Sequence, residues 1–436
     1  MKTKIIASVL TAGLLLALTP SFKSIKKNPL DHTHVAMCGT KGCAFKTLFS
    51  EEDATGFATF KTEETVEQSM QDGLIFLAKS QQQDGGWGAG SHSAQHIRDP
   101  HAVGTDPATT AMAGMAFIRS GSSLKTGAYT RQLNGALHYL LKAVEQTPKD
   151  HSRITDLIGT QIQTKLGQNI DAVMAAQFFN NVLTLDDMEP AMQQRVKAAL
   201  TKCVGFIEMN QSADGSTEGD GWAGVLQSSF ANQALEAAAL NEVVVDDKAL
   251  RRAKEFQKKN YDASTGKVDT ERGAGVILYA VSGSVRASAK EAAKAQQLVN
   301  DAVKSGKLKD GEVTQQALEK LGLDREEAAH LSDSYAIYQS AKDQAQRDDV
   351  LTGFGNNGGE EFLSFLQTGE SLVIAGGDDW KKWYDNMAGR ILQIQNEDGS
   401  WNGHHCITSP VFCTATSLLI LSIDKDVDRL RRLGDS

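Results

Sequence analysis

Residues 81–87 read Gln-Gln-Gln-Asp-Gly-Gly-Trp, and residues 395–401 keep the same spacing of Gln, Asp, Gly and Trp in Gln-Asn-Glu-Asp-Gly-Ser-Trp. A third copy at 211–215 keeps the Gln-x-x-Asp-Gly half and is followed by a delayed Gly221-Trp222. A sequence motif that recurs within one chain indicates a repeat architecture. The motif residues are Gln81, Asp84, Gly85, Trp87, Gln211, Asp214, Gly215, Trp222, Gln395, Asp398, Gly399 and Trp401.

The chemistry of the motif predicts a structural role. Apolar residues before Gln81 have helical spacing. Asp84-Gly85 is expected to end that helix, because Asp favours turns and Gly adopts positive φ without a clash. The tryptophan is expected to fold back over the glutamine amide, which would bond backbone groups at the helix end. We therefore interpret every copy, Trp222 included, as a tie between one helix and the following loop.

Two kinds of predicted helix alternate along the chain. Amphipathic, charged helices are expected at 131–146, 191–210, 248–259, 285–303 and 380–395. Nearly uncharged helices are expected at 108–118, 170–182, 230–240, 273–281, 362–374 and 413–423. A charged helix needs one wet face, whereas an uncharged helix is buried all round. The pattern predicts an all-α fold with an outer barrel around an inner one, an α6/α6 toroid.

The motif copies carry a resemblance to a known family. Together with the apolar, small-residue helices that follow them, such as 109–115 and 415–419, they resemble the repeats of the terpenoid cyclase and protein prenyltransferase superfamily. The resemblance covers roughly residues 63–423 and implies an α/α toroid. Fold similarity does not fix function.

The chemical signatures that the resemblance implies are missing. Squalene-type cyclases use an Asp-x-Asp-Asp acid, and the chain has no such motif. Aromatic residues make up only 6% of the chain, which argues against a cation-stabilising cavity. Prenyltransferases hold zinc with Asp, Cys and His; Cys413 falls near the family's histidine position, but the Asp-x-Cys pair has no match.

A candidate metal site lies in the loops after the first and last motif copies. A closed ring would bring these loops together at one rim. Zinc accepts the mixture of His and Cys ligands that they carry. The alternative is that the histidines are scattered and that Cys406 and Cys413 form a disulfide. The candidate ligands are His92, His96, His101, His404, His405, Cys406 and Cys413.

Three functions remain open on these residues. The first is binding of an apolar or isoprenoid-like ligand in a central cavity lined by Ala, Met, Phe and Leu of the inner helices. The second is an enzyme: a divergent cyclase, a metal-dependent rim enzyme, or a polysaccharide-active toroid. The polysaccharide reading has the candidates Asp171, Glu236, Arg272, Tyr279, Glu360 and Glu361. The third is a scaffold that presents its loops to a protein partner.

The N-terminal sequence and the net charge indicate where the protein is located and which partners it can have. A basic start followed by the apolar run 5–18 predicts an export signal over residues 1–24, so we expect an exported, periplasmic or extracellular protein without a transmembrane anchor once the signal is removed. A polar segment at 25–62, the toroid at 63–423 and a charged tail at 424–436 would follow. The net charge of −9 argues against a nucleic-acid partner. Cys38/Cys43 and Cys406/Cys413 are the local pairs we expect as disulfides, with Cys203 left over.

Overall fold

The computed structural model describes residues 63–148, 150–217, 219, 221–353, 359–404 and 406–435. The predicted signal and polar segment, Cys38, Cys43, His405 and most of the Gly/Asn loop at 353–359 lie outside these residues. The helices and strands of the first half are α3 (Glu63–Lys79), η2 (His92–Ala94), α4 (Pro107–Arg119), α5 (Thr130–Gln146), α6 (Gln161–Leu166), α7 (Ile170–Val182), α8 (Pro190–Met209), α9 (Gly224–Leu240), α10 (Asp247–Lys259), β1 (Tyr261–Asp262) and β2 (Lys267–Val268). Those of the second half are η3 (Glu271–Gly273), α11 (Ile277–Lys304), α12 (Gln315–Lys320), α13 (Arg325–Ala345), α14 (Asp348–Leu351), α15 (Glu360–Ile374), α16 (Asp379–Gln393), α17 (Pro410–Leu421), η4 (Ile423–Asp426) and α18 (Val427–Asp435).

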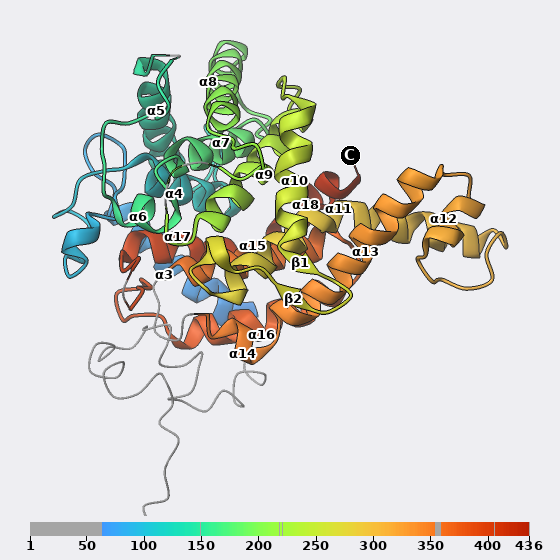
Figure 1. The fold of residues 1–436 in the computed structure, drawn as a ribbon. Coiled ribbons are helices and arrows are strands. Elements are labelled where there is room, and N and C mark those ends of the chain that lie inside the picture. Colours follow the sequence, from blue (N-terminus) through green and yellow to red (C-terminus); the bar gives the residue numbers. More distant parts are fainter. Residues whose placement is uncertain are drawn as a thin grey trace, which may run out of the picture.

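The described part of the chain forms a closed ring of six inner helices inside an outer layer, which confirms the predicted all-α toroid. Each inner helix packs against the next, and the last packs against the first, in the order α4, α7, α9, α11, α15, α17. The outer helices α3, α5, α8, α10, α13 and α16 lie against them. Figure 1 shows α3, at the start of the described chain, beside α17 near its end.

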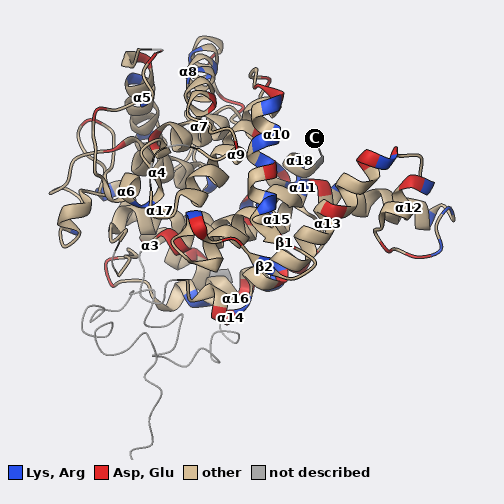
Figure 2. Cartoon of the chain, viewed as in Figure 1, with Lys and Arg blue, Asp and Glu red and all other residues tan. Residues whose placement is uncertain are grey.

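Charge follows these two layers. Figure 2 shows acidic and basic residues along outer helices such as α10, whereas the inner helices α4 and α7 have almost none. Buried side chains of α4 and α7 include Phe117, Phe178 and Phe179, all without exposed surface. No described helix is long and apolar enough to cross a membrane.

The motif glutamine ties each outer helix to the next outer helix around the ring. The Nε2 of Gln81 donates to the carbonyl of its own turn at Gly85 and to that of Gln132 in α5, both at 2.9 Å. Gln395 makes the same pair of bonds, to Gly399 at 2.8 Å and to Ser69 of α3 at 2.9 Å. This last bond closes the outer layer.

The motif glycine lets the turn sit directly on the neighbouring backbone. Gly85 has φ of +88°, and a Cβ there would lie 2.6 Å from the carbonyl oxygen of Gly135 in α5. A Cβ on Gly399 would lie 2.6 Å from the carbonyl oxygen of Asp72 in α3. A residue with a side chain would therefore be strained and would also push the two helices apart.

One pair of predicted helices is a single element. The sequence ranges 273–281 and 285–303 were expected as an inner and an outer helix, but α11 runs unbroken from Ile277 to Lys304. Its first half belongs to the inner ring and its second half projects outward with α12 and α13 (Figure 1). We call this projection, residues 290–335, the arm. It has a small apolar core of its own, made by Ala295, Val299, Leu318, Ala328 and Leu331.

All inner helices run in the same direction, so the ring has two different ends. First turns meet at one end: the backbone N–H of Ala108 in α4 bonds Asp171 in α7 at 3.1 Å, and Tyr279 of α11 bonds Glu361 of α15. Last turns meet at the other, where Arg119 of α4 bonds the carbonyl of Leu419 in α17 at 2.9 Å. We call these ends the N-terminal mouth and the C-terminal mouth. The final helix, α18, packs against α9, α11 and α15 at the C-terminal mouth.

Candidate functional site

The N-terminal mouth brings together the loops after the first and last motif copies, as ring closure requires. Gln95, in the loop after the first motif, donates through Nε2 to the Cys406 carbonyl at 3.0 Å. Its own carbonyl accepts from the Thr408 hydroxyl at 2.6 Å. A third segment of the chain joins these two loops: Gln161, at the start of α6, accepts a hydrogen bond from the Thr408 N–H at 2.7 Å.

Trp222 does not hold the place that its sequence context predicts. Trp87 and Trp401 are fully buried, each with its backbone N–H on a threonine hydroxyl at 2.9 Å. In the third copy Thr217 takes that position, with its N–H on the Ser228 hydroxyl at 2.9 Å. Trp222 instead lies at the N-terminal mouth with 61% of its surface exposed. The expectation that it is a structural plug is wrong, because the longer turn of this copy moves it five residues beyond the motif position.

A buried lysine lies against this exposed tryptophan. Lys165 of α6 is 3% exposed, and its Nζ lies 3.8 Å from the centroid of the Trp222 ring, a cation–π distance. The ammonium also hydrogen-bonds the Cys406 thiol and is close enough to lower the pKa of His92, second to burial. Its neighbours therefore come from three separate parts of the sequence.

Two buried carboxyl groups complete this polar cluster. Glu360 and Glu361 open α15 and are each 2% exposed. Burial raises the pKa of Glu360 to about 7, against the opposing effect of its backbone, Lys165 and the Cys406 thiol. Its Oε2 makes no hydrogen bond to any described residue. Glu361 accepts from the Tyr279 hydroxyl at 2.7 Å, and burial together with Glu361 raises the pKa of Tyr279 well above its usual value.

A second pair of buried acids supports the same mouth. Asp106 caps α4, accepting from the N–H groups of Thr109 and Ala89 at 2.7 and 2.8 Å, and burial raises its pKa. Asp171 accepts from Gln163 at 2.7 Å, and burial followed by repulsion from Asp106 raises its pKa to about 7. Partial positive charge at helix N-termini favours acids in these positions. These aspartates have helix-end partners, so we assign them a supporting role.

The predicted metal ligands are only partly gathered. His92 bonds Gln95 at 2.7 Å, His101 bonds the Lys79 carbonyl at 3.1 Å, His96 is exposed, and His404 is buried. Within the described residues, no three His, Cys, Asp or Glu side chains are arranged to hold a metal ion. His405 lies outside those residues. A zinc site at this rim stays a prediction.

The expected disulfide between Cys406 and Cys413 is wrong. Both thiols are buried and neither is in a disulfide, which is also true of Cys203. Cys413 faces back to the carbonyl of Ile407 at 3.8 Å from within the first turn of α17. Cys406 has φ of +70°, an uncommon conformation for a residue with a side chain. Burial and the neighbouring Glu360 raise the pKa of the Cys406 thiol, so it is a proton donor here and not a nucleophilic thiolate.

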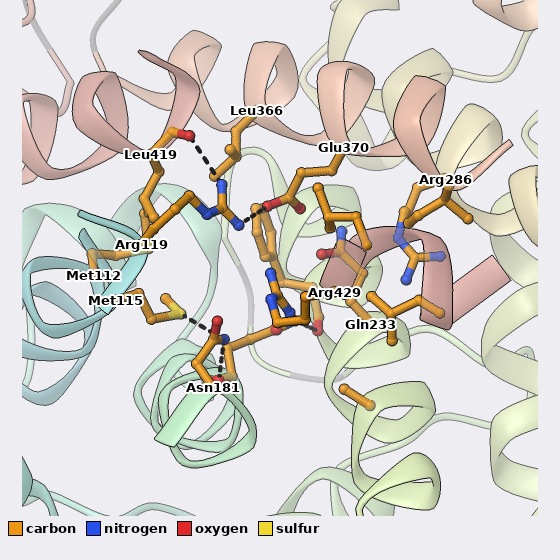
Figure 3. Close-up of a pocket in the computed structure, with 16 residues that line it drawn as sticks. Met112, Met115, Arg119, Asn181, Gln233, Arg286, Leu366, Glu370, Leu419 and Arg429 are labelled. Atoms are coloured by element: carbon orange, nitrogen blue, oxygen red, sulfur yellow. Dashed lines mark hydrogen bonds and ion pairs between the residues drawn. The ribbon is translucent and has the colours of Figure 1, made fainter. Parts of the chain in front are cut away.

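The centre of the ring is narrow and is lined by both apolar and charged side chains. Its cavity has a volume of about 40 Å³ and is lined by all six inner helices and α18 (Figure 3). Its walls carry Met112, Met115 and Leu366, as expected, but also Arg119, Arg286, Glu370 and Arg429. Ligand pockets usually measure about 300 to 1,000 Å³. A cavity of this volume, lined by described residues, has no room for an isoprenoid.

Other candidates for polysaccharide chemistry have structural partners. Glu236 binds Arg286 at 2.8 Å and Lys254 at 2.7 Å; burial alone would raise its pKa, and these cations bring it down to about 2. Arg272 pairs with the motif residue Asp214 at 3.1 Å on the surface. Among these candidates, the N-terminal mouth gathers Glu360, Glu361, Tyr279 and Asp171.

Sequence reasoning missed Lys165, Gln161 and Gln95. They lie outside every motif copy, and their roles come from ring closure. One signal was present: Lys165 belongs to a short helix with a complete capping box from Thr160 and Gln163, which fixes its first turn.

Comparisons with known proteins add little to this geometry. No family model matches the chain, and no curated protein matches it. Among solved structures, it is similar to the type II terpene cyclase MstE from Scytonema in its apo form, with 12% sequence identity and a TM-score of 0.35. That alignment covers 84% of this chain and 100% of the other. At this TM-score the likeness carries no argument, and the toroid rests on the helix contacts themselves.

Proposed function

We propose that this chain binds an apolar ligand with one polar end, of isoprenoid-like size, at the N-terminal mouth of the ring. The observation that carries the proposal is Trp222, an exposed indole lying against a buried lysine. A single exposed aromatic side chain is ordinary, whereas a contiguous group of exposed apolar side chains marks a binding site.

Further apolar side chains surround the same end. Ile158 is 68% exposed, Leu157 is 40% exposed, and Ile277 at the start of α11 is 39% exposed. With Trp222 they offer an apolar surface, while Lys165 and Glu360 offer a donor and an acceptor beneath it. The ligand's apolar part would cover the surface and its polar end would reach this pair. The proposal therefore moves the expected ligand from the central cavity to the mouth.

The test uses farnesol, an isoprenoid alcohol, added to the full chain. We expect wild-type protein to bind it with quenching of tryptophan fluorescence, and Trp222→Ala and Ile158→Ser to weaken binding at least about ten-fold, a loss of about 1.4 kcal/mol. Val244→Ser is the matched control, because Val244 is 88% exposed beyond the end of α9, at the opposite mouth.

Stability keeps this test interpretable. Trp222→Ala is expected to lower the free energy of unfolding by no more than about 2 kcal/mol, because it removes the cation–π contact with the buried Lys165. Equal farnesol affinity in the wild type and in both mouth variants would refute the site. Absence of farnesol binding by the wild type, together with no lipid in mass spectra of the purified protein, would refute the ligand class.

A second candidate function is acid–base catalysis at the same mouth. The observation in its favour is Glu360, which has a pKa of about 7 and lies beside the Cys406 thiol. General acids work best when their pKa is near the working pH. If the mouth is catalytic, turnover of a bound ligand should disappear in Glu360→Gln while ligand affinity stays within a few-fold of wild type.

A further inference from the structure

The last helix of the chain, α18, covers the C-terminal mouth and reaches into the central cavity. Arg429, Leu430 and Leu433 line this cavity together with residues of the inner helices. Leu430 is 1% exposed, and Figure 3 shows Arg429 among the lining residues. The volume of about 40 Å³ is therefore what remains while these side chains of α18 occupy the mouth.

The ring does not depend on α18 for its closure. Each inner helix contacts the next, and α17 contacts α4 directly. The nine residues of α18 follow all of these helices and pack on α9, α11 and α15. A helix of this length is marginal in isolation, so α18 owes its helical form to this docking. Its release would uncover the cavity and leave the ring closed.

Release of α18 would uncover an apolar wall. Leu430 and Leu433 share the cavity with apolar side chains from four of the inner helices. These side chains are Met112, Met115, Phe230, Leu366, Ile374 and Leu419. The uncovered mouth would therefore favour a ligand that is mainly apolar.

The charges at this mouth balance only while α18 is docked. Arg119 binds Glu370 at 2.5 Å and Asp426 at 2.9 Å, and Arg429 of α18 binds Asp426 at 2.5 Å. Arg286, the third arginine on the wall, has an ion pair of its own. Asp426 lies in η4, which packs on α4 and α17 before α18 begins. Without Arg429, the two carboxylates would share Arg119 alone.

The ends of the inner helices add to this preference for a cation. The last turns of α4, α15 and α17 lie at the C-terminal mouth, and helix C-termini carry partial negative charge. Arg429 now supplies positive charge there, close enough to Glu370 to interact with it electrostatically. A ligand that replaces α18 would therefore need a positive charge as well as an apolar part.

We propose that α18 is a lid over a second binding site, and that an apolar ligand with one cationic end displaces it from the C-terminal mouth. The cation would take the place of the Arg429 guanidinium beside Glu370 and Asp426. The apolar part would take the place of Leu430 and Leu433. Aliphatic amines have this chemistry. The site lies at the other end of the ring from Trp222, so it does not depend on the function proposed above.

The first experiment adds decylamine, which is protonated at about pH 7, to the full chain. Isothermal titration calorimetry should show that decylamine binds at least about ten-fold more tightly than decanoate, which has a similar apolar chain and the opposite charge. Hydrogen exchange of residues 427–435 should become at least about ten-fold faster at saturating decylamine, because the lid has been released. Farnesol, the probe of the N-terminal mouth, should leave this exchange unchanged.

Gly434→Ala loosens the lid without changing a residue of the cavity wall. A Cβ at this position would lie 2.5 Å from the Ile374 carbonyl oxygen at the end of α15, so α18 must shift. Apparent affinity increases with the fraction of molecules that are open, so decylamine should bind this variant at least about five-fold more tightly than wild type. Gly311→Ala is the matched control and should bind as wild type does, because a Cβ there would have no heavy atom within 4 Å.

A second variant tests the cation itself. Glu370→Gln removes one of the two carboxylates and should weaken decylamine binding at least about ten-fold. If this variant does not fold, the comparison of Gly434→Ala with wild type still decides. Absence of decylamine binding, unchanged exchange of residues 427–435 in its presence, or equal affinities of Gly434→Ala and wild type would each overturn the proposal.

Discussion

The burial of Glu360 makes the free energy of unfolding depend on pH. Its pKa rises from the ordinary value of 4.5 to about 7. Below pH 4.5 both the folded and the unfolded chain hold this proton, so it has no effect there. Between these pKa values only the folded chain keeps the proton, so the free energy of unfolding falls as pH rises, by about 3.5 kcal/mol in total at 1.4 kcal/mol per pKa unit. Asp171, also at about 7, acts with the same sign.

We therefore predict that Glu360→Gln reduces the loss of stability on going from about pH 5 to about pH 8 by about 2 to 3 kcal/mol, because its neutral amide cannot ionise. Urea denaturation at the two pH values measures this loss for wild type and variant. Glu326→Gln, at an exposed position in α13, is the control and should follow wild type. A wild-type pH dependence in Glu360→Gln would contradict the assigned burial penalty.

At the residue scale, sequence reasoning identified motif residues better than it assigned their roles. The spacing of Gln81, Asp84 and Gly85 correctly predicted a turn, because glycine at positive φ has a local physical cause. It could not show that Gln81 bonds Gln132 or that Thr217 replaces a tryptophan in the third copy. Those facts depend on which outer helix lies alongside, which local propensity does not encode.

The inner helices are rich in small residues because neighbouring helices pack closely around them. An inner helix is covered on every side, so outer side chains approach its backbone closely. A Cβ on Gly369 of α15 would lie 2.3 Å from the Trp383 ring of α16, and one on Gly114 of α4 would lie 2.4 Å from the Phe178 ring of α7. Glycine thus sets how closely α15 approaches the outer helix α16, and how closely α4 approaches its inner neighbour α7.

We predict that Gly369→Ala lowers the free energy of unfolding by about 1 to 3 kcal/mol, although alanine is the better helix former, because the packed indole must move. Gly205→Ala is the matched control. Gly205 lies within α8, and a Cβ there would have no heavy atom within 4 Å. That change should stabilise the chain by about 0.4 to 1 kcal/mol. Urea denaturation of both variants tests this, and equal effects would contradict the packing argument.

The misjudged element, α11, shows the limit of periodicity. Residues 273–281 have the uncharged pattern of an inner helix and residues 285–303 the charged pattern of an outer helix, which favoured two helices. The helix continues because the Ser284 hydroxyl bonds the Gln257 carbonyl at 2.7 Å, which holds it against α10. Propensities of a few tenths of a kcal/mol per residue are easily outweighed by such tertiary contacts.

At the scale of the whole molecule, the ring and the arm differ in how much they contribute to the free energy of unfolding. The ring core is continuous around all inner helices, whereas the arm has a separate small core. Outer helix α3 is part of the ring, since Gly73 lies where a Cβ would be 2.8 Å from the Trp401 ring. The alternation of charged and uncharged helices predicted this ring. The charged groups at the narrow centre were not predictable, because side chains such as Arg119 and Asp426 meet only once the ring is closed.

We predict that replacing the arm residues 308–323 by a short Gly/Ser linker lowers the free energy of unfolding by at most about 2 kcal/mol, near the value for burial of one leucine. Unfolding should remain a single transition by circular dichroism. Deleting residues 63–79 should instead abolish the cooperative transition, because it opens the outer layer between α16 and α5 and uncovers the inner helix α17. A cooperative transition in that deletion would contradict the view that the ring folds as one unit.

The ion pair between Lys425 and Glu67, at 2.8 Å, puts the last turn of the ring beside its first helix. The same ring could then be formed by chains that begin at a different helix. A circular permutant that starts at the exposed Gly311 in the arm, with a linker from residue 435 to residue 63, would keep every contact of the ring. The contacts of the ring therefore do not depend on where in the ring the chain begins and ends.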